Sequence, residues 1–225
     1  MNAGSDLRPM ATTTRRKGKT RSVREAVREE TRAAYREAIL SAASEVFGRL
    51  GFHDAKMADI AAEAGVAAGT LYNYFSSKEE VFASILERGQ EQLFGALAEV
   101  VARGGDPLDR LQEVLRTLYG FLERSGPFFA VYLRQGGLAE WTRQRLRESE
   151  DRTFHRNLAL MEGLLREACE AGLLRGDRDP DELGAVLAGI SDAQIFAWVR
   201  RGCPPDLTAR SAVVFDLFLH GASRR

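Results

Sequence analysis

Four arginines near the start of the chain have a spacing suited to binding phosphate groups. They recur every four residues: Arg24, Arg28, Arg32 and Arg36. Residues four apart lie on nearly the same face of an α-helix, and a row of guanidinium groups can pair with the phosphates of nucleic acid. Because Glu25 and Glu29 each precede an arginine by three residues, the pattern is also typical of a solvated helix with local ion pairs. Both interpretations stay open.

A second candidate lies in residues 59–75, DIAAEAGVAAGTLYNYF, which contain two short helical patterns around a glycine. Gly65 can adopt the left-handed conformation that the turn needs, and the small Ala61 lets the helices cross closely. Five side chains are expected to form a small core: Ile60, Ala64, Val66, Leu71 and Tyr74. The second helix then exposes a row of mostly small or polar residues: Ala67, Ala68, Gly69, Thr70, Tyr72 and Asn73. This pattern predicts a helix-turn-helix, whose second helix fits the major groove of DNA.

The composition predicts a globular chain with a basic arm. Of the 225 residues, 44% are hydrophobic and 28% are charged, and the formal net charge is zero. Residues 1–22 are polar and lack apolar periodicity, which predicts a disordered arm. No apolar stretch follows the basic run at 15–17, and no run reaches the roughly 20 apolar residues of a membrane span. Cys169 and Cys203 form no CxxC pair, so we expect a cytoplasmic protein with reduced thiols.

The remaining elements are predicted to be helices, giving an all-α fold of about nine helices. Ser77 has capping-box spacing to Glu80, and Asp106-Pro107 and Asp179-Pro180 place proline in the first turn of a helix. No sustained apolar–polar alternation or hairpin turn indicates strands. The helices are expected up to residue 50, where Gly51 ends the first, and at 57–64, 68–74, 78–101, 107–124, 127–134, 138–171, 180–201 and 206–220.

Several short motifs in one register resemble the DNA-binding domain of the tetracycline-repressor (TetR) family. They are Gly51-Phe52, Asp59-Ile60-Ala61, Gly65-Val66, the run GTLYNYF at 69–75, and Ser77-Lys78-Glu79. The resemblance covers about residues 39–86. It implies an all-α homodimer with a helix-turn-helix domain at 23–80 and a helical effector-binding and dimerisation domain at 81–225. It also implies that a small effector releases the protein from operator DNA, with no cofactor.

The resemblance assigns roles to individual residues of the helix-turn-helix. Thr70, Tyr72 and Tyr74 are the implied DNA contacts. Gly69 gives backbone access to the DNA, and Lys78 holds a phosphate. The first helix of the family packs with its N-terminal end near the sugar-phosphate backbone, so Arg32 and Arg36 are expected to touch phosphates.

Two stretches depart from the family pattern. Ala55-Lys56 stands where Thr or Ser often opens the second helix, so Asp54 or Ala55 is expected to cap it and Lys56 to contact a phosphate. Ala67-Ala68 stands where polar residues are common. Two alanines on the reading face predict fewer hydrogen bonds to bases and more use of thymine methyl groups or DNA shape.

The second half of the chain has no catalytic signature. It contains no GxSxG, P-loop or Rossmann motif, and His155 and His220 have no metal-ligand spacing. Neither an enzyme nor a metal site is expected. Seven aromatic residues are candidates for lining a pocket for an apolar or amphipathic effector, with core packing as the alternative: Phe121, Phe128, Phe129, Tyr132, Trp141, Phe154 and Phe196.

The last two predicted helices carry more apolar surface than one packing contact needs. A four-helix bundle across a two-fold axis would bury it, and a tightly packed monomer is the alternative. The candidate interface residues are Leu183, Val186, Leu187, Ile190, Val213, Val214, Leu217 and Phe218.

The sequence therefore predicts a ligand-responsive transcriptional regulator, and a repressor in preference to an activator. Two other classes remain in competition. One is a helix-turn-helix module that binds another protein and has no small effector. The other is an enzyme on a helical scaffold, which the missing acid, base and metal groups argue against.

Overall fold

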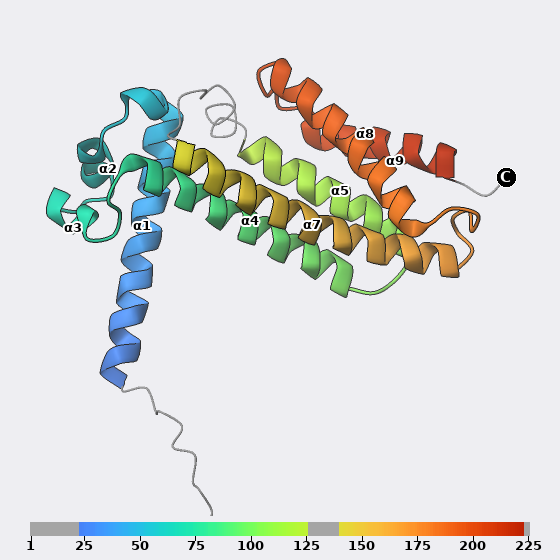
Figure 1. The fold of residues 1–225 in the computed structure, drawn as a ribbon, viewed down its shortest axis with the longest axis horizontal. Coiled ribbons are helices and arrows are strands. Elements are labelled where there is room, and N and C mark those ends of the chain that lie inside the picture. The colour runs from blue at the N-terminus through green and yellow to red at the C-terminus, as the bar shows by residue number, and fades with distance from the viewer. Residues whose placement is uncertain (1–22, 126–139, 223–225) are drawn as a thin grey trace, which may run out of the picture. The chain divides into compact units, whose positions relative to one another are not determined.

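The structure is a computed structural model that describes residues 23–125 and 140–222, with the side chains of 140–154 excepted. Residues up to Arg36 and residues from Glu37 onward form two separate compact units. The described residues form eight α-helices (Figure 1): α1 (Val23–Asp54), α2 (Met57–Glu63), α3 (Ala68–Tyr72), α4 (Lys78–Ala102), α5 (Pro107–Arg124), α7 (Glu140–Glu170), α8 (Pro180–Arg200) and α9 (Leu207–Ala222). The all-α fold is confirmed, and the helix predicted at 127–134 lies outside the described residues.

Three helices begin at the caps that the sequence predicts. The Asp106 carboxylate accepts a hydrogen bond from the N–H of Leu108 at 2.8 Å, and Pro107 opens α5. Asp179 caps α8 through the N–H of Asp181 at 3.0 Å, again with proline first. The Ser77 hydroxyl caps α4. Each cap satisfies a backbone N–H that the helix itself leaves unpaired.

Helices α1 to α4 share a small hydrophobic core. The rings of Phe47, Phe52 and Phe82 pack against one another with centroids 5.2–5.6 Å apart. Gly51 interrupts the helical geometry of α1 with a φ of 77°, and Phe52 beyond it is buried. Leu50 is exposed, and Phe52 occupies the core at this end of α1.

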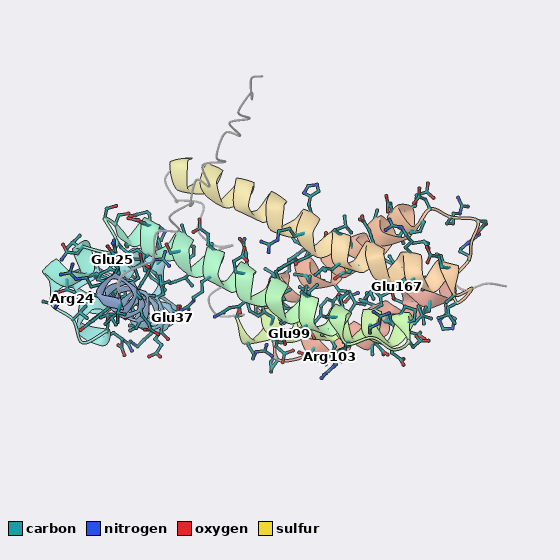
Figure 2. All side chains as sticks on the ribbon, turned by 90° about the horizontal axis from the view of Figure 1, so that it is seen from below. Arg24, Glu25, Glu37, Glu99, Arg103 and Glu167 are labelled. Carbon is teal, nitrogen blue, oxygen red and sulfur yellow. The ribbon has the colours of Figure 1, made fainter. Side chains whose placement is uncertain are left out.

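A larger core lies among α4, α5, α7, α8 and α9 (Figure 1). Its bulkiest fully buried side chains are Trp198 and Tyr119. Helix α4 contributes to both cores, because its first two turns pack with α1–α3 and its later turns pack with α5 and α7. Charged residues such as Glu99, Arg103 and Glu167 lie on the exposed surface (Figure 2).

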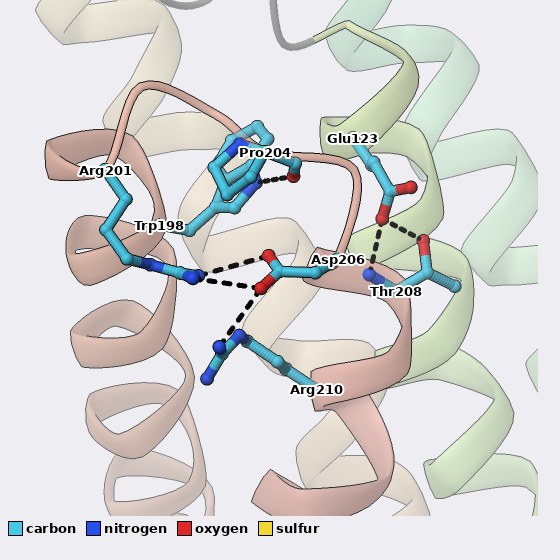
Figure 3. A network of polar contacts seen from close by, with 7 residues as sticks. All are labelled: Glu123, Trp198, Arg201, Pro204, Asp206, Thr208 and Arg210. Atoms are coloured by element: carbon cyan, nitrogen blue, oxygen red, sulfur yellow. Dashed lines mark hydrogen bonds and ion pairs between the residues drawn. The ribbon is translucent and has the colours of Figure 1, made fainter.

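The junction between α5 and α9 is held by polar contacts (Figure 3). The Glu123 carboxylate accepts hydrogen bonds from the N–H and the hydroxyl of Thr208, at 2.6 and 2.7 Å. Two residues before Thr208, Asp206 accepts from Arg201 at 2.9 Å and from Arg210 at 3.1 Å. Glu123 near the end of α5 thus caps the start of α9, although the two residues are far apart in the sequence.

Candidate DNA interface and effector domain

The predicted turn between α2 and α3 is present. Gly65 has a φ of +65°, the left-handed conformation that glycine adopts most readily. The N–H of Val66 donates to the carbonyl of Ala61 at 3.0 Å, which closes the end of α2. Ile60 on α2 and Leu71 on α3 are both fully buried. These contacts hold the short α3 against α2, so its outer face is set by the core beneath it.

The outer face of α3 is mostly open to solvent. Tyr72 is 55% exposed. The expected reading residues divide between exposed and half-buried positions: Ala67, Ala68, Gly69 and Asn73 are exposed, and Thr70 and Tyr74 are half-buried. Phe75 is buried in the core. Since α3, AGTLY, contains no charged residue, any positive charge that pairs with DNA phosphates has to come from flanking segments.

Lys78 has a different role from the expected phosphate contact. Its Nζ donates to three backbone carbonyls, those of Phe52 at 2.8 Å, His53 at 2.9 Å and Ala55 at 3.2 Å. It also lies 4.7 Å from the centroid of the Phe52 ring. An ammonium group has three N–H donors, and these contacts occupy all of them. Lys78 therefore closes the C-terminal end of α1, which sequence spacing alone could not reveal.

Lys56 precedes α2 and remains exposed. Its backbone N–H donates to the carboxylate of Asp59 at 2.9 Å. Lys56 is thus the N-cap residue of α2, and Asp59 at the third helical position accepts its main-chain N–H. The expectation of a cap at Asp54 or Ala55 is wrong. The hydrogen bond uses the main chain of Lys56, which leaves its ammonium group available for phosphate.

The arginine row lies on the exposed N-terminal part of α1. All four arginines, from Arg24 to Arg36, are exposed. They belong to the first of the two compact units. Contact of Arg32 and Arg36 with DNA stays a prediction.

Most of the aromatic residues expected around an effector fall where the structure gives no side-chain position. Phe128, Phe129 and Tyr132 lie outside the described residues, and Trp141 and Phe154 belong to the part of α7 whose side chains are not described. Phe121 is half-buried on α5 against Gly89 of α4. Phe196 is 65% exposed on α8, so its assignment to an interior pocket is wrong. The apolar periodicity of α8 did not reveal which side faces outward.

The eight candidate interface residues divide between the core and the surface. Four are buried within the chain's own core and are not available to a partner: Leu183, Leu187, Val214 and Phe218. Val186, Val213 and Leu217 are exposed, and Ile190 is half-buried. Together with Phe196, the exposed three form what we call the outer apolar face of α8 and α9. Val186 and Leu217 of this face line a groove of about 370 Å³ between the two helices.

Helix α8 is unusually apolar for a surface element. Its 21 residues are long and apolar enough to span a membrane by length and composition alone. Only 33% of its most apolar stretch is buried inside the chain. One face packs on α7 and α9. The apolar remainder is of the kind that marks an interaction surface in a folded protein.

Comparisons with known proteins agree with this arrangement. Residues 39–85 match the family described as bacterial regulatory proteins, tetR family. The chain is 27% identical to the fatty acid metabolism regulator protein of Bacillus subtilis, over 81% of this chain and 93% of that protein. It is also 27% identical to the transcriptional repressor KstR2 of Mycobacterium tuberculosis, over 76% and 84%.

A solved structure supports the same relationship over most of the chain. The transcriptional regulator FadR from Bacillus subtilis, in complex with stearoyl-CoA, superposes with a TM-score of 0.66. The identity is 25%, over 82% of this chain and 98% of that one. These matches relate residues 39–85 to the tetR family of bacterial regulatory proteins, and most of the chain to transcriptional regulators of similar fold.

Proposed function

We propose that this protein is a transcriptional repressor that binds operator DNA as a homodimer and is released by a small apolar or amphipathic effector. The observation that carries the proposal is the helix-turn-helix at residues 39–85, with α3 held on a buried base and its outer face exposed. An activator is the second candidate. The proposal places the protein in the cytoplasm, where its DNA is, and assigns it no catalytic activity.

In this proposal, the exposed face of α3 enters the major groove. Thr70, Tyr72, Asn73 and Tyr74 supply the polar and aromatic contacts. The small side chains of Ala67, Ala68 and Gly69 let the backbone approach and can contact thymine methyl groups. Phosphate contacts come from Lys56, Arg32 and Arg36, because Lys78 already donates to backbone carbonyls.

The effector is proposed to bind among the helices of the domain at 81–225, whose interior is a large hydrophobic core. The DNA-binding domain is proposed to span 23–80, with the first turns of α4 completing its core. The FadR structure holds stearoyl-CoA, an amphipathic molecule with a long apolar chain. A ligand of that general character suits the apolar interior here.

Pairing of two copies is proposed to occur through the outer apolar face of α8 and α9. A self-complementary surface on two adjacent helices can form a four-helix bundle across a two-fold axis. Such a dimer would cover Val186, Phe196, Val213 and Leu217. The same contact explains why a helix as apolar as α8 has an exposed side.

Operator binding is tested by measuring DNA affinity against salt concentration. The full-length protein is compared on the duplex upstream of its own coding sequence and on a scrambled duplex. We expect a preference for the upstream duplex that Tyr72→Ala removes and Leu173→Ala, an exposed change outside α3, preserves. Equal affinity for both duplexes at every salt concentration contradicts operator binding at that site.

A promoter–reporter fusion separates repressor from activator. Deletion of the gene for this protein should raise reporter expression, because an unliganded repressor blocks its promoter. A fall in expression after deletion supports the activator instead.

A further inference from the structure

Three helices of the larger core bring polar side-chain atoms into an otherwise apolar interior. Tyr119 on α5 is fully buried, and its hydroxyl donates to the carbonyl of Ser191 on α8 at a long 3.4 Å. Ser191 is 4% exposed, and its own hydroxyl has no hydrogen-bond partner among the described residues. Asn157 on α7 is half-buried as a residue, and its carboxamide oxygen is buried without a hydrogen-bond partner among the described residues. We call these three side chains the inner polar cluster.

The register between α5 and α7 places Tyr119 and Asn157 at the same level of the bundle. Arg110 near the start of α5 pairs with Glu167 near the end of α7, and the two helices run in opposite directions (Figure 1). Tyr119 is nine residues beyond Arg110, and Asn157 is ten residues before Glu167. At about 1.5 Å per residue, the two levels differ by roughly 2 Å.

The register between α7 and α8 brings Ser191 to the same layer. A Cβ on Gly184 would lie 3.1 Å from Cγ of Glu162, so these residues mark where the two helices touch. Ser191 is seven residues beyond Gly184, and Asn157 is five residues before Glu162 on the antiparallel helix. The offset is two residues, or roughly 3 Å. All three members of the cluster therefore lie in one layer, inside the domain proposed to bind effector.

Buried polar groups in proteins nearly always have hydrogen-bond partners, and a buried group without one lowers stability by about 1–3 kcal/mol. Two such groups in one layer define a candidate position for a ligand that supplies the partners. The carboxamide oxygen of Asn157 accepts a hydrogen bond, whereas the Ser191 hydroxyl can donate or accept. A ligand group that both donates and accepts would satisfy both.

The charge around the cluster favours a neutral group. Burial raises the pKa of Tyr119, and the nearby carboxylate of Asp192 raises it further. Tyr119 thus stays protonated at neutral pH. An anionic ligand group beside Tyr119 would therefore meet the carboxylate of Asp192.

We propose that the inner polar cluster binds a neutral hydroxyl or amide group of the effector, while the apolar body of the effector packs among α4, α5, α7 and α8. This inference rests on the proposed function and adds the chemical class of the ligand's polar group. It assigns ligand contacts to Asn157 and Ser191, with Tyr119 holding the Ser191 backbone in place.

The test uses four probes with the same ten-carbon chain: 1-decanol, decanamide, decanoate and decyl methyl ether. Dissociation constants are measured by isothermal titration calorimetry on the full-length protein. We expect decanol and decanamide to bind roughly tenfold more tightly than the ether, which cannot donate a hydrogen bond. Decanoate should bind more weakly than the amide.

Two variants on different helices test the residues, so failure of one to fold leaves the other informative. Ser191→Ala and Asn157→Leu should each bring the ratio of the affinities for decanol and for the ether toward one. The matched control is Ser211→Ala, because Ser211 is also 4% exposed but its hydroxyl donates to the Thr208 carbonyl at 2.7 Å. This control should keep the wild-type ratio.

Several results overturn the inference: tightest binding of decanoate, equal binding of decanol and ether, or a ratio that both variants leave unchanged. Absence of binding by all four probes also overturns it. DNA affinity measured on the same wild-type preparation separates the two proposals. If the protein prefers its operator but binds the four probes without selectivity, only the inference about the inner polar cluster is overturned. If the protein shows no operator preference, the proposed regulatory function itself is overturned.

Discussion

At the scale of single residues, two lysines close to the helix-turn-helix differ in their surroundings, so a substitution of one serves as the control for the other. Lys78 donates to three backbone carbonyls, whereas Lys56 is exposed. We expect Lys78→Met to lower the free energy of unfolding by about 2 kcal/mol or more, because three carbonyls lose a charged donor. Urea denaturation measures this loss.

For Lys56→Met we expect a change in DNA binding and not in stability. The slope of log affinity against log salt should fall by about 0.9, the value for one lost phosphate contact, with stability nearly unchanged. Salt titrations of both variants, made well below their melting temperatures, check this. A reduced slope for Lys78→Met with unchanged stability would show that Lys78 binds phosphate after all.

Gly65 and Gly69 form a second pair. A Cβ at either position meets no other atom within 4 Å, but Gly65 has a φ of +65°. Gly65→Ala should therefore lower stability by about 1 kcal/mol through conformational strain alone. Gly69→Ala should leave stability unchanged or slightly higher and weaken DNA binding, because the methyl group stands on the reading face. Thermal melts and DNA titrations measure the two effects, and equal loss of stability in both variants contradicts the argument.

At the scale of elements, the contact between Glu123 and α9 should depend on pH. Hydrogen bonds from the N–H and hydroxyl of Thr208 hold the pKa of Glu123 below its usual value. A carboxyl whose pKa is lower in the folded state stabilises the fold above its unfolded pKa, and this contribution is lost as pH falls through the folded pKa. Glu123→Gln should thus lower stability by up to about 1 kcal/mol at pH 7.

The difference between wild type and Glu123→Gln should shrink below about pH 4.5, as followed by urea denaturation across a pH series. Glu99→Gln, at an exposed position on α4, is the control and should show little difference at any pH. A difference for Glu123→Gln that is constant from pH 3 to pH 7 would mean that the carboxylate charge does not contribute to the cap.

At the scale of the whole molecule, the outer apolar face should determine the assembly. Leu217→Asp places a charge on this face without entering the core, since Leu217 is 55% exposed. We expect a mass near 24.9 kDa in sedimentation, about half that of the wild type, with unchanged helical content. Operator affinity should fall as well, because a monomer presents one α3 where a dimer presents two.

The control for this variant is Leu173→Asp, at an exposed apolar residue outside α8 and α9, which should leave the mass unchanged. If Leu217→Asp sediments with the same mass as the wild type, the surface through which two copies pair lies elsewhere. Unfolding of the variant would instead indicate that Leu217 supports the chain's own core.

Local signals allowed much of the fold to be predicted. Asp106 and Asp179, each followed by proline, start their helices as predicted because a cap depends only on the nearest residues in the chain. Gly65 is left-handed for the same local reason. The α2–α3 turn and the burial of Ile60 and Leu71 follow from helical periodicity over a short segment.

The sequence by itself therefore determined the elements, the turn and the exposed outer face of α3, since these depend on neighbours in the chain. Only the tertiary structure decided which partners distant groups find. It directs Lys78 to the end of α1, and it turns Leu187 into the core and Phe196 outward on the same helix. When a helix is apolar on most sides, its sequence does not indicate which side neighbouring helices will cover. The hydrophobic effect has no preferred direction, so the buried side is decided by how whole helices pack.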